Sequence, residues 1–198
     1  MERELRFNPA EVRADKAEDG KQTLSGIAVV YNSLSQDLGG FRERILPGAL
    51  TKVLASPDNI FATTDHNLTV VTTLGSRENQ TLSLWDTPEG LAFTVTMPDT
   101  TTARDAFTNV SNGNISGMSF AFTCAKDQWS VDESGQRIRE VLEFGALYEI
   151  SIVVNPAYTQ SNVTAAMRSL EAWEKTTQKT PDAEILRKRL ELLSLGWK

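Results

Sequence analysis

Two serines and a glycine stand together at the start of an alternating aromatic pattern, in the segment Asn114 to Phe122. Ser116 and Ser119 carry the hydroxyls, and Gly117 lies between them. A glycine beside a serine allows a sharp backbone turn, and such a turn can offer N–H groups to a developing negative charge. The same residue types also begin strands that carry no chemistry. The segment is therefore a candidate nucleophile turn that needs partners elsewhere in the chain.

The base that such a serine requires is restricted by composition, because His66 is the only histidine of the chain. A hydroxyl becomes a nucleophile when an adjacent base accepts its proton. His66 lies in the polar run Thr63-Thr64-Asp65-His66-Asn67, at the end of a predicted strand. A lone histidine is also commonly a structural residue. If the chain performs serine chemistry, His66 is the base.

A third group that holds the imidazole would come from the acids near predicted strands. The candidates are Asp65, Glu140, Glu143 and Glu149. Glu149 stands out because it interrupts the apolar run 147–154, where an unpaired carboxylate costs free energy. Two explanations stay open at this point: Glu149 faces water, or it pairs with His66.

Metal and disulfide chemistry have little support in the sequence. Cys124 is the only cysteine, and no second histidine stands at a metal-binding spacing from His66. Cys124 lies in an apolar run, which is typical of a small buried hydrophobic residue. We therefore expect no metal and no organic cofactor.

Composition bounds the remaining function classes. The chain has 198 residues, 40% of them hydrophobic, and a formal net charge of -6 without a cluster of basic residues. Nucleic-acid binders concentrate Lys and Arg on one face, so a nucleic-acid partner is not expected. No apolar run approaches the roughly 20 residues that a bilayer-spanning helix needs, and no signal peptide is indicated. We expect a cytosolic globular protein without a membrane partner.

Hydrophobic periodicity predicts many strands and few helices. Short helices are expected at 49–54 and 102–112, the second ending at Gly113. The charged residues before Thr23 are expected to form a short strand at best. The succession of hairpins predicts an α+β, mainly β fold, an antiparallel β-barrel core flanked by short helices. Strands are expected at 24–32, 41–45, 59–64, 68–74, 81–85, 91–97, 118–129, 138–144 and 147–154.

The composition changes after Thr164, which predicts a barrel domain at 1–168 and a helical C-terminal tail at 169–198. Asp182 is a plausible N-cap for a helix at 182–195. Such an amphipathic helix can dock on its own core, on a partner or on another copy of the chain, so self-association is one of three alternatives.

An ordered series of segments between Leu24 and Arg168 resembles the prohead serine proteases of tailed phages, which are similar in fold to the herpesvirus assembly proteases. Members commonly have an Asn-His-Asp sequence around the histidine, whereas this chain has Asp65-His66-Asn67, so the neighbouring hydrogen bonds are arranged differently here. The segments are 26–32, 41–43, 45–49, His66, 74–75, 97–100, 115–120, 126–129, 147–153 and 155–158.

The resemblance implies a serine endopeptidase with His66 as base and Glu149 as the group that orients the imidazole. We favour Ser116 as nucleophile because Gly117 follows it, with Ser119 as second choice, and the N–H groups around Gly117 are candidates for the oxyanion hole.

The implied substrates are the major capsid protein and scaffold polypeptide, cut inside the assembling prohead in the host cytoplasm during head maturation. A free phage and an integrated prophage are both compatible origins. The alternative is a non-enzymatic scaffold or assembly protein on the same fold.

Overall fold

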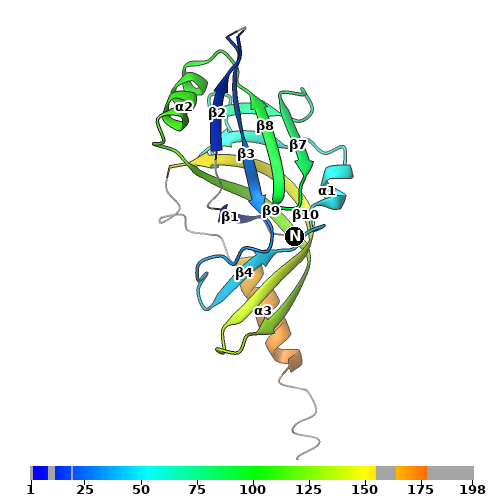
Figure 1. Cartoon of the computed structure of the whole chain (residues 1–198). Coiled ribbons are helices and arrows are strands. Elements are labelled where there is room, and N and C mark those ends of the chain that lie inside the picture. The colour runs from blue at the N-terminus through cyan, green and yellow to red at the C-terminus, as the bar shows by residue number, and fades with distance from the viewer. Residues whose placement is uncertain (1, 9–11, 19, 155–163, 178–198) are drawn as a thin grey trace, which may run out of the picture. The chain divides into compact units, whose positions relative to one another are not determined.

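A computed structural model of the chain describes residues 2–8, 12–18, 20–154 and 164–177 (Figure 1). The chain divides into two units, Met1–Val163 and Thr164–Lys198. The first unit contains every strand that the structure describes. The predicted division at 168/169 is not tested by this separation and stays a prediction.

A six-stranded sheet is built around two long neighbouring strands, β9 (Gly117–Val131) and β10 (Arg137–Val153), which pair antiparallel. Strand β1 (Glu4–Asn8) pairs antiparallel with the other edge of β9. On the far edge of β10, both β4 (Phe41–Ile45) and β5 (Phe61–Thr64) pair parallel to it, and β6 (Thr73–Ser76) follows β5. Strand β10 thus lies between β9 on one side and β4 and β5 on the other, and the segment that follows β5 lies next to it.

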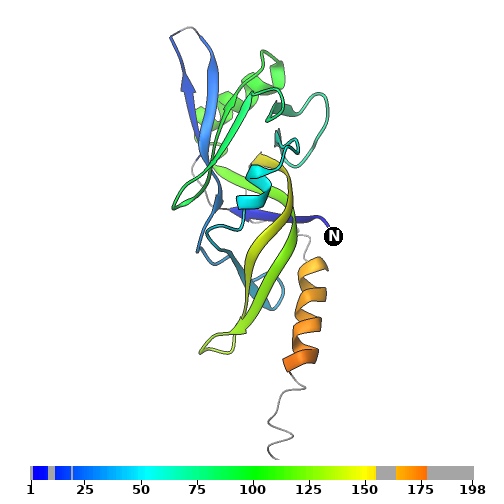
Figure 2. The same cartoon turned by 90° about the vertical axis from the view of Figure 1, so that its right-hand side faces the viewer.

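A second sheet of four strands has the order β2-β3-β8-β7 and is antiparallel throughout. Its strands are β2 (Val12–Lys16), β3 (Gln22–Val30), β7 (Leu82–Asp86) and β8 (Gly90–Thr96). Two views of the chain show this sheet beyond one end of the bent β9–β10 pair (Figures 1 and 2). The predicted hairpin between residues 81 and 97 is confirmed as the β7–β8 pair.

Two short helices belong to the first unit. Helix α1 (Thr51–Ala55) follows β4, and α2 (Thr101–Ser111) precedes β9. The Thr100 hydroxyl caps α2 by accepting from the Ala103 N–H, and Gly113 adopts the left-handed φ of 72° expected beyond a helix end. Both helix predictions are confirmed within a few residues.

The core draws on both sheets. The Phe144 ring stacks with those of Phe120 and Phe122, with 4.4 Å between the centroids of Phe122 and Phe144. The second sheet adds Leu24 and Phe93, which are fully or almost fully buried. The close packing of this apolar interior supports the strands of the six-stranded sheet that also carry polar side chains.

The mainly β prediction holds, but the antiparallel barrel is not confirmed. Among the described residues the strands form two open sheets, and β10 makes two parallel pairings. The strands predicted at 138–144 and 147–154 form one strand, because register shifts between Val141 and Glu149 allow β10 to continue past Gly145.

The second unit is described only over α3 (Thr164–Thr177), a helix that begins before the predicted boundary at 168/169 and continues into the predicted tail. The helix predicted at 182–195 lies outside the described residues. None of the helices that the structure describes is long and apolar enough to cross a membrane.

A buried cluster of charged side chains fixes β1 to the six-stranded sheet. Arg6 and Arg139 lie between Glu4 and Glu43, with 2.8 Å from Arg6 Nε to Glu43 Oε1 and 2.7 Å from Arg139 Nη1 to Glu43 Oε2. Arg139 also donates to Glu4 and to Asp127. These ions are removed from water, so their stability depends on complete pairing.

Glu43→Gln is expected to lower the free energy of unfolding by about 3 kcal/mol at neutral pH, because it leaves buried guanidinium charge uncompensated. Burial opposes ionisation of Glu43, but Arg6 and Arg139 outweigh it and hold the pKa of Glu43 below its ordinary 4.5. The contribution is therefore present above pH 4.5 and is lost as pH falls through the depressed pKa of the folded state. Urea unfolding at several pH values measures it, and a variant difference that stays constant on acidification would contradict this account.

Candidate active site

Adjacent strands bring polar side chains to one face of the six-stranded sheet. Ser119 on β9 lies directly opposite Ser151 on β10, and Ser151 lies opposite Thr63 on β5. Glu149 stands two positions from Ser151 on the same strand and therefore on the same face. This face receives the loop after β5, which carries His66.

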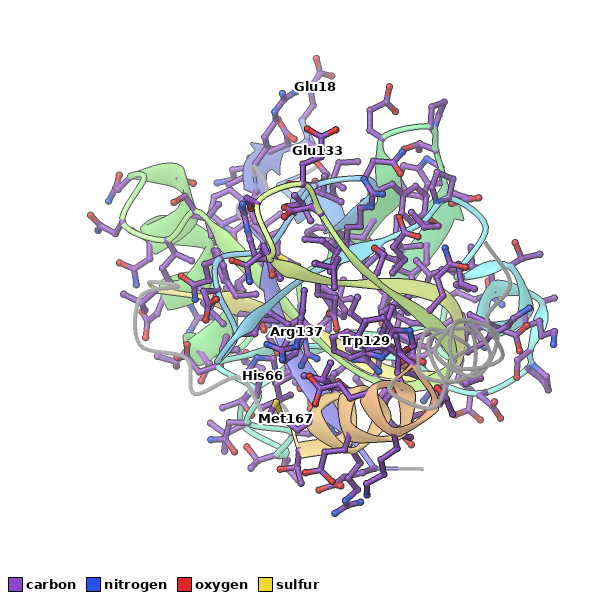
Figure 3. All side chains as sticks on the ribbon, turned by 90° about the horizontal axis from the view of Figure 1, so that it is seen from below. Glu18, His66, Trp129, Glu133, Arg137 and Met167 are labelled. Carbon is purple, nitrogen blue, oxygen red and sulfur yellow. The ribbon has the colours of Figure 1, made fainter. Side chains whose placement is uncertain are left out.

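Three side chains form a continuous line of hydrogen bonds. The His66 Nδ1 to Glu149 Oε1 distance is 2.7 Å, and the His66 Nε2 to Ser119 Oγ distance is 2.5 Å. An ionised carboxylate can only accept, so Nδ1 carries the imidazole proton and Nε2 accepts from the serine hydroxyl. This is the arrangement of a nucleophile, a base and a group that orients the base. Figure 3 labels His66 among the side chains.

The backbone at His66 adopts a conformation that residues other than glycine rarely adopt. Asp65 and His66 have φ values of 47° and 58°, both in the left-handed region. The Asp65 N–H donates to the Ile152 carbonyl at 3.1 Å, and the His66 N–H donates to Ser151 Oγ at 3.2 Å. These bonds to β10 hold a strained turn whose geometry aims the imidazole at Ser119.

The rest of the loop is fixed by a buried hydroxyl. Thr63 Oγ1 lies 2.8 Å from the Asn67 carbonyl oxygen and 3.0 Å from the Thr72 carbonyl oxygen. Thr63 is 1% exposed, so these contacts are shielded from water. The segment after His66 is therefore held to the sheet at two points, which limits the positions open to the imidazole.

Glu149 is fully buried, so the explanation that it faces water is wrong. Its Oε1 atom accepts from His66 and also from Arg3 Nη2, at 2.9 Å. Its Oε2 atom is buried without a hydrogen-bond partner among the described residues. The Oε1 atom of Glu149 thus accepts from both the Arg3 guanidinium and the His66 imidazole.

The two candidate serines occupy different environments. Ser119 is buried, and its Oγ lies 2.8 Å from the Arg6 carbonyl oxygen as well as beside His66. Ser116 is exposed and lies just before β9. Within the described residues, the hydroxyl that contacts the His66 imidazole is that of Ser119, which differs from our preference for Ser116.

Gly117 lies two residues before Ser119 on β9, in tight contact with its neighbours. A Cβ atom there would come within 2.6 Å of the Phe7 ring and 3.2 Å of the Val153 carbonyl oxygen. The glycine is therefore needed for the packing of β1. Its role in an oxyanion hole stays a prediction.

The other candidate groups from the sequence lie apart from this line. Glu140 pairs with Arg44 and Gln128, and Glu143 pairs with Lys52. Burial raises the pKa of the Cys124 thiol to about 12, which disfavours the reactive thiolate. None of these contacts involves His66.

Sequence reasoning missed the contributions of the N-terminal segment and of Ser151. Arg3 contacts Glu149, and the Arg6 carbonyl contacts Ser119, although both residues precede the predicted strand at 24–32. Strand β1 is short and charged, so no periodic signal marked it. Alternation along the strand puts Ser151 on the same face as Glu149, but the sequence gives no signal that its hydroxyl accepts from the His66 N–H.

The chain is similar to several known proteins. A sequence profile described as caudovirus prohead serine protease matches residues 8–176. The prohead protease of Enterobacteria phage HK97 is 30% identical over 172 residues, which cover 86% of this chain and 70% of that protein. Among solved structures, the capsid assembly protease of bacteriophage T4 is 12% identical with a TM-score of 0.46, over 79% of this chain and 100% of that one.

Proposed function

Since the chain belongs to the caudovirus prohead serine protease family and is therefore a serine protease, we propose that it cleaves capsid and scaffold polypeptide during phage head maturation, using Ser119, His66 and Glu149. The observation that carries this assignment is the line of hydrogen bonds from Ser119 through His66 to Glu149. The non-enzymatic scaffold alternative is set aside, because the family is one of proteases.

The proposed reaction is acyl transfer in two steps. Ser119 Oγ attacks the scissile carbonyl carbon while its proton passes to His66 Nε2, and the imidazolium then gives that proton to the leaving amine. Water repeats the sequence on the acyl-enzyme and releases the carboxylate product. Glu149 holds the Nδ1 proton in place and stabilises the imidazolium that forms in both steps.

Ser119 replaces Ser116 as the proposed nucleophile for a geometric reason. A nucleophile must lie within hydrogen-bond reach of its base, and Ser119 Oγ lies 2.5 Å from the nitrogen that would accept its proton. The sequence preference for Ser116 rested on the following glycine, which instead accommodates Phe7.

The resting site is covered, because Ser119 is only 1% exposed. A substrate carbonyl therefore reaches Oγ only after a neighbouring group has moved. The Arg6 carbonyl oxygen, which lies 2.8 Å from Ser119 Oγ, is on the edge strand β1 and belongs to this cover.

The proposed substrates are polypeptides of the assembling head, in keeping with the family and with the HK97 relative, a prohead protease. The proposed place of action is the interior of the prohead in the host cell. The proposed catalytic residues are the side chains of Ser119, His66 and Glu149, and the proposed reaction uses no metal or organic cofactor.

The experiment that tests the proposal combines cleavage with covalent labelling. The chain is co-expressed with the major capsid protein of its own phage, and a processing preparation is treated with a fluorophosphonate that reacts with activated serines. We expect a shortened capsid protein and label on the peptide that contains Ser119. Label on Ser116 would overturn the assignment of the nucleophile, and intact capsid protein without label would overturn the proposed activity.

A further inference from the structure

The buried carboxylate of Glu149 has a permanent counter-charge that the three-residue line does not include. Arg3 Nη2 donates to Glu149 Oε1 at 2.9 Å, and His66 Nδ1 lies 2.7 Å from the same oxygen atom. Because arginine stays protonated at all relevant pH values, this charge remains when the imidazole is neutral. We propose that Arg3 is a positioning residue that keeps Glu149 ionised and sets the pH at which the site works.

The need for such a counter-charge follows from burial. Glu149 is 0% exposed, and its second oxygen finds no hydrogen-bond partner among the described residues. An ionised carboxylate in this setting is costly unless it is paired. A neutral His66 supplies one hydrogen bond but no charge, so Arg3 supplies the charge in the resting state.

Arg3 is itself held by a second contact. Its guanidinium carbon lies 5.3 Å from the centroid of the Tyr148 ring, in a cation–π arrangement beside Glu149. The Arg3 side chain is 44% exposed, so it bridges the buried carboxylate and the solvent. This geometry places a cation close to the imidazole, with Glu149 Oε1 between them.

Few structural elements bring other charged groups close to Glu149 and His66. Glu149 lies opposite Ala121 on β9 and Phe61 on β5, neither of which is charged. The loop after β5 adds the exposed acid Asp65 next to His66. On β1, Glu4 and Arg6 take part in the buried cluster with Glu43 and Arg139. Arg3 is thus the guanidinium that contacts the carboxylate.

Replacing Arg3 shifts the pH dependence in the same direction whether Glu149 or His66 of the coupled pair holds the proton. Removing a positive charge beside two coupled groups favours proton binding to the pair as a whole. Protonation of the pair inactivates it, since His66 must be neutral to accept the Ser119 proton. Arg3→Gln should therefore move the acid limb of the activity profile to higher pH.

The test measures capsid cleavage by wild type, Arg3→Gln and Arg3→Lys from pH 5.5 to 9. We expect Arg3→Gln to lower the ratio of rates at pH 6 and pH 8 by about threefold to tenfold, as for one partly screened charge. Arg3→Lys keeps the charge and should restore most of the wild-type profile. Arg104→Gln is the matched control, because Arg104 pairs with Asp99 at the exposed start of α2.

A second readout is independent of activity, because the inference rests on the proposed function of the site. His66 is the only histidine, so a single imidazole NMR signal can be titrated in Ser119→Ala, with and without Arg3→Gln. We expect the midpoint to move to higher pH when Arg3 is replaced. Coinciding titrations in a folded variant would overturn the role of Arg3. A shifted midpoint in a chain that never cleaves capsid protein would instead leave Arg3 supported and the proposed function refuted.

Discussion

Ser119→Ala is expected to abolish capsid cleavage, with a loss of about 10⁴-fold to 10⁶-fold in kcat, while Ser116→Ala stays within a few fold of wild type. The difference follows from position, because Ser119 Oγ contacts His66 Nε2 and Ser116 lies exposed ahead of β9. Cleavage of the co-expressed capsid protein, followed by mass spectrometry over a time course, measures both variants.

The pair of variants controls for folding as well as chemistry. Ser119 is buried with its Oγ in polar contact with His66 and the Arg6 carbonyl, so its loss should lower stability by roughly 1 kcal/mol, far less than the expected effect on rate. Thermal unfolding of both variants checks this. Full activity of Ser119→Ala combined with loss in Ser116→Ala would refute our choice and restore the preference drawn from the sequence.

The choice between the two serines shows what a sequence pattern leaves open. Ser119 is on β9 opposite Ser151 and therefore faces the same side of the sheet as Glu149, whereas Ser116 precedes the strand and is not placed by its pairing. The strand that decides this begins at Gly117, and its register against β10 is set by long-range pairing. The sequence pattern located the segment but carried no information on that register.

The elements predicted best are those determined locally. The β7–β8 hairpin and α2 carry their turn and capping residues within the segment itself. The parallel pairing of β10 with β4 and β5 joins segments about a hundred residues apart, and no local pattern encodes it. For that reason the predicted antiparallel barrel is not confirmed, and the strands form two open sheets over the part of the chain that the structure describes.

The sequence indicates the candidate base and acid through an unusual residue count and an unusual residue position, and not through hydrophobic periodicity. His66 is a single histidine, and Glu149 is a carboxylate in an apolar strand. Arg3 has neither property, since it is one charge among several in the first residues of the chain. Its contact with Glu149 depends on β1 lying beside β9, which the buried charges of Glu4 and Arg6 stabilise.

Glu149→Gln is expected to lower kcat by about 10³-fold to 10⁴-fold without unfolding the chain. The amide is nearly the same size, but it has no charge to stabilise the imidazolium that forms when His66 takes the Ser119 proton. An amide nitrogen turned toward Nδ1 would also favour the wrong tautomer of the imidazole. Single-turnover cleavage of capsid protein, with chain concentration in excess, measures the chemical step.

Glu143→Gln is the matched control, because Glu143 lies on the same strand and pairs with Lys52 outside the site. Its rate should remain near wild type. The Glu149→Gln background also isolates Arg3: once the carboxylate charge is gone, a further Arg3→Gln replacement should change the pH profile little, since the two act through one interaction. Equal effects of Arg3→Gln in both backgrounds would show that Arg3 acts on His66 without Glu149, and would contradict the coupling that the shared Oε1 atom implies.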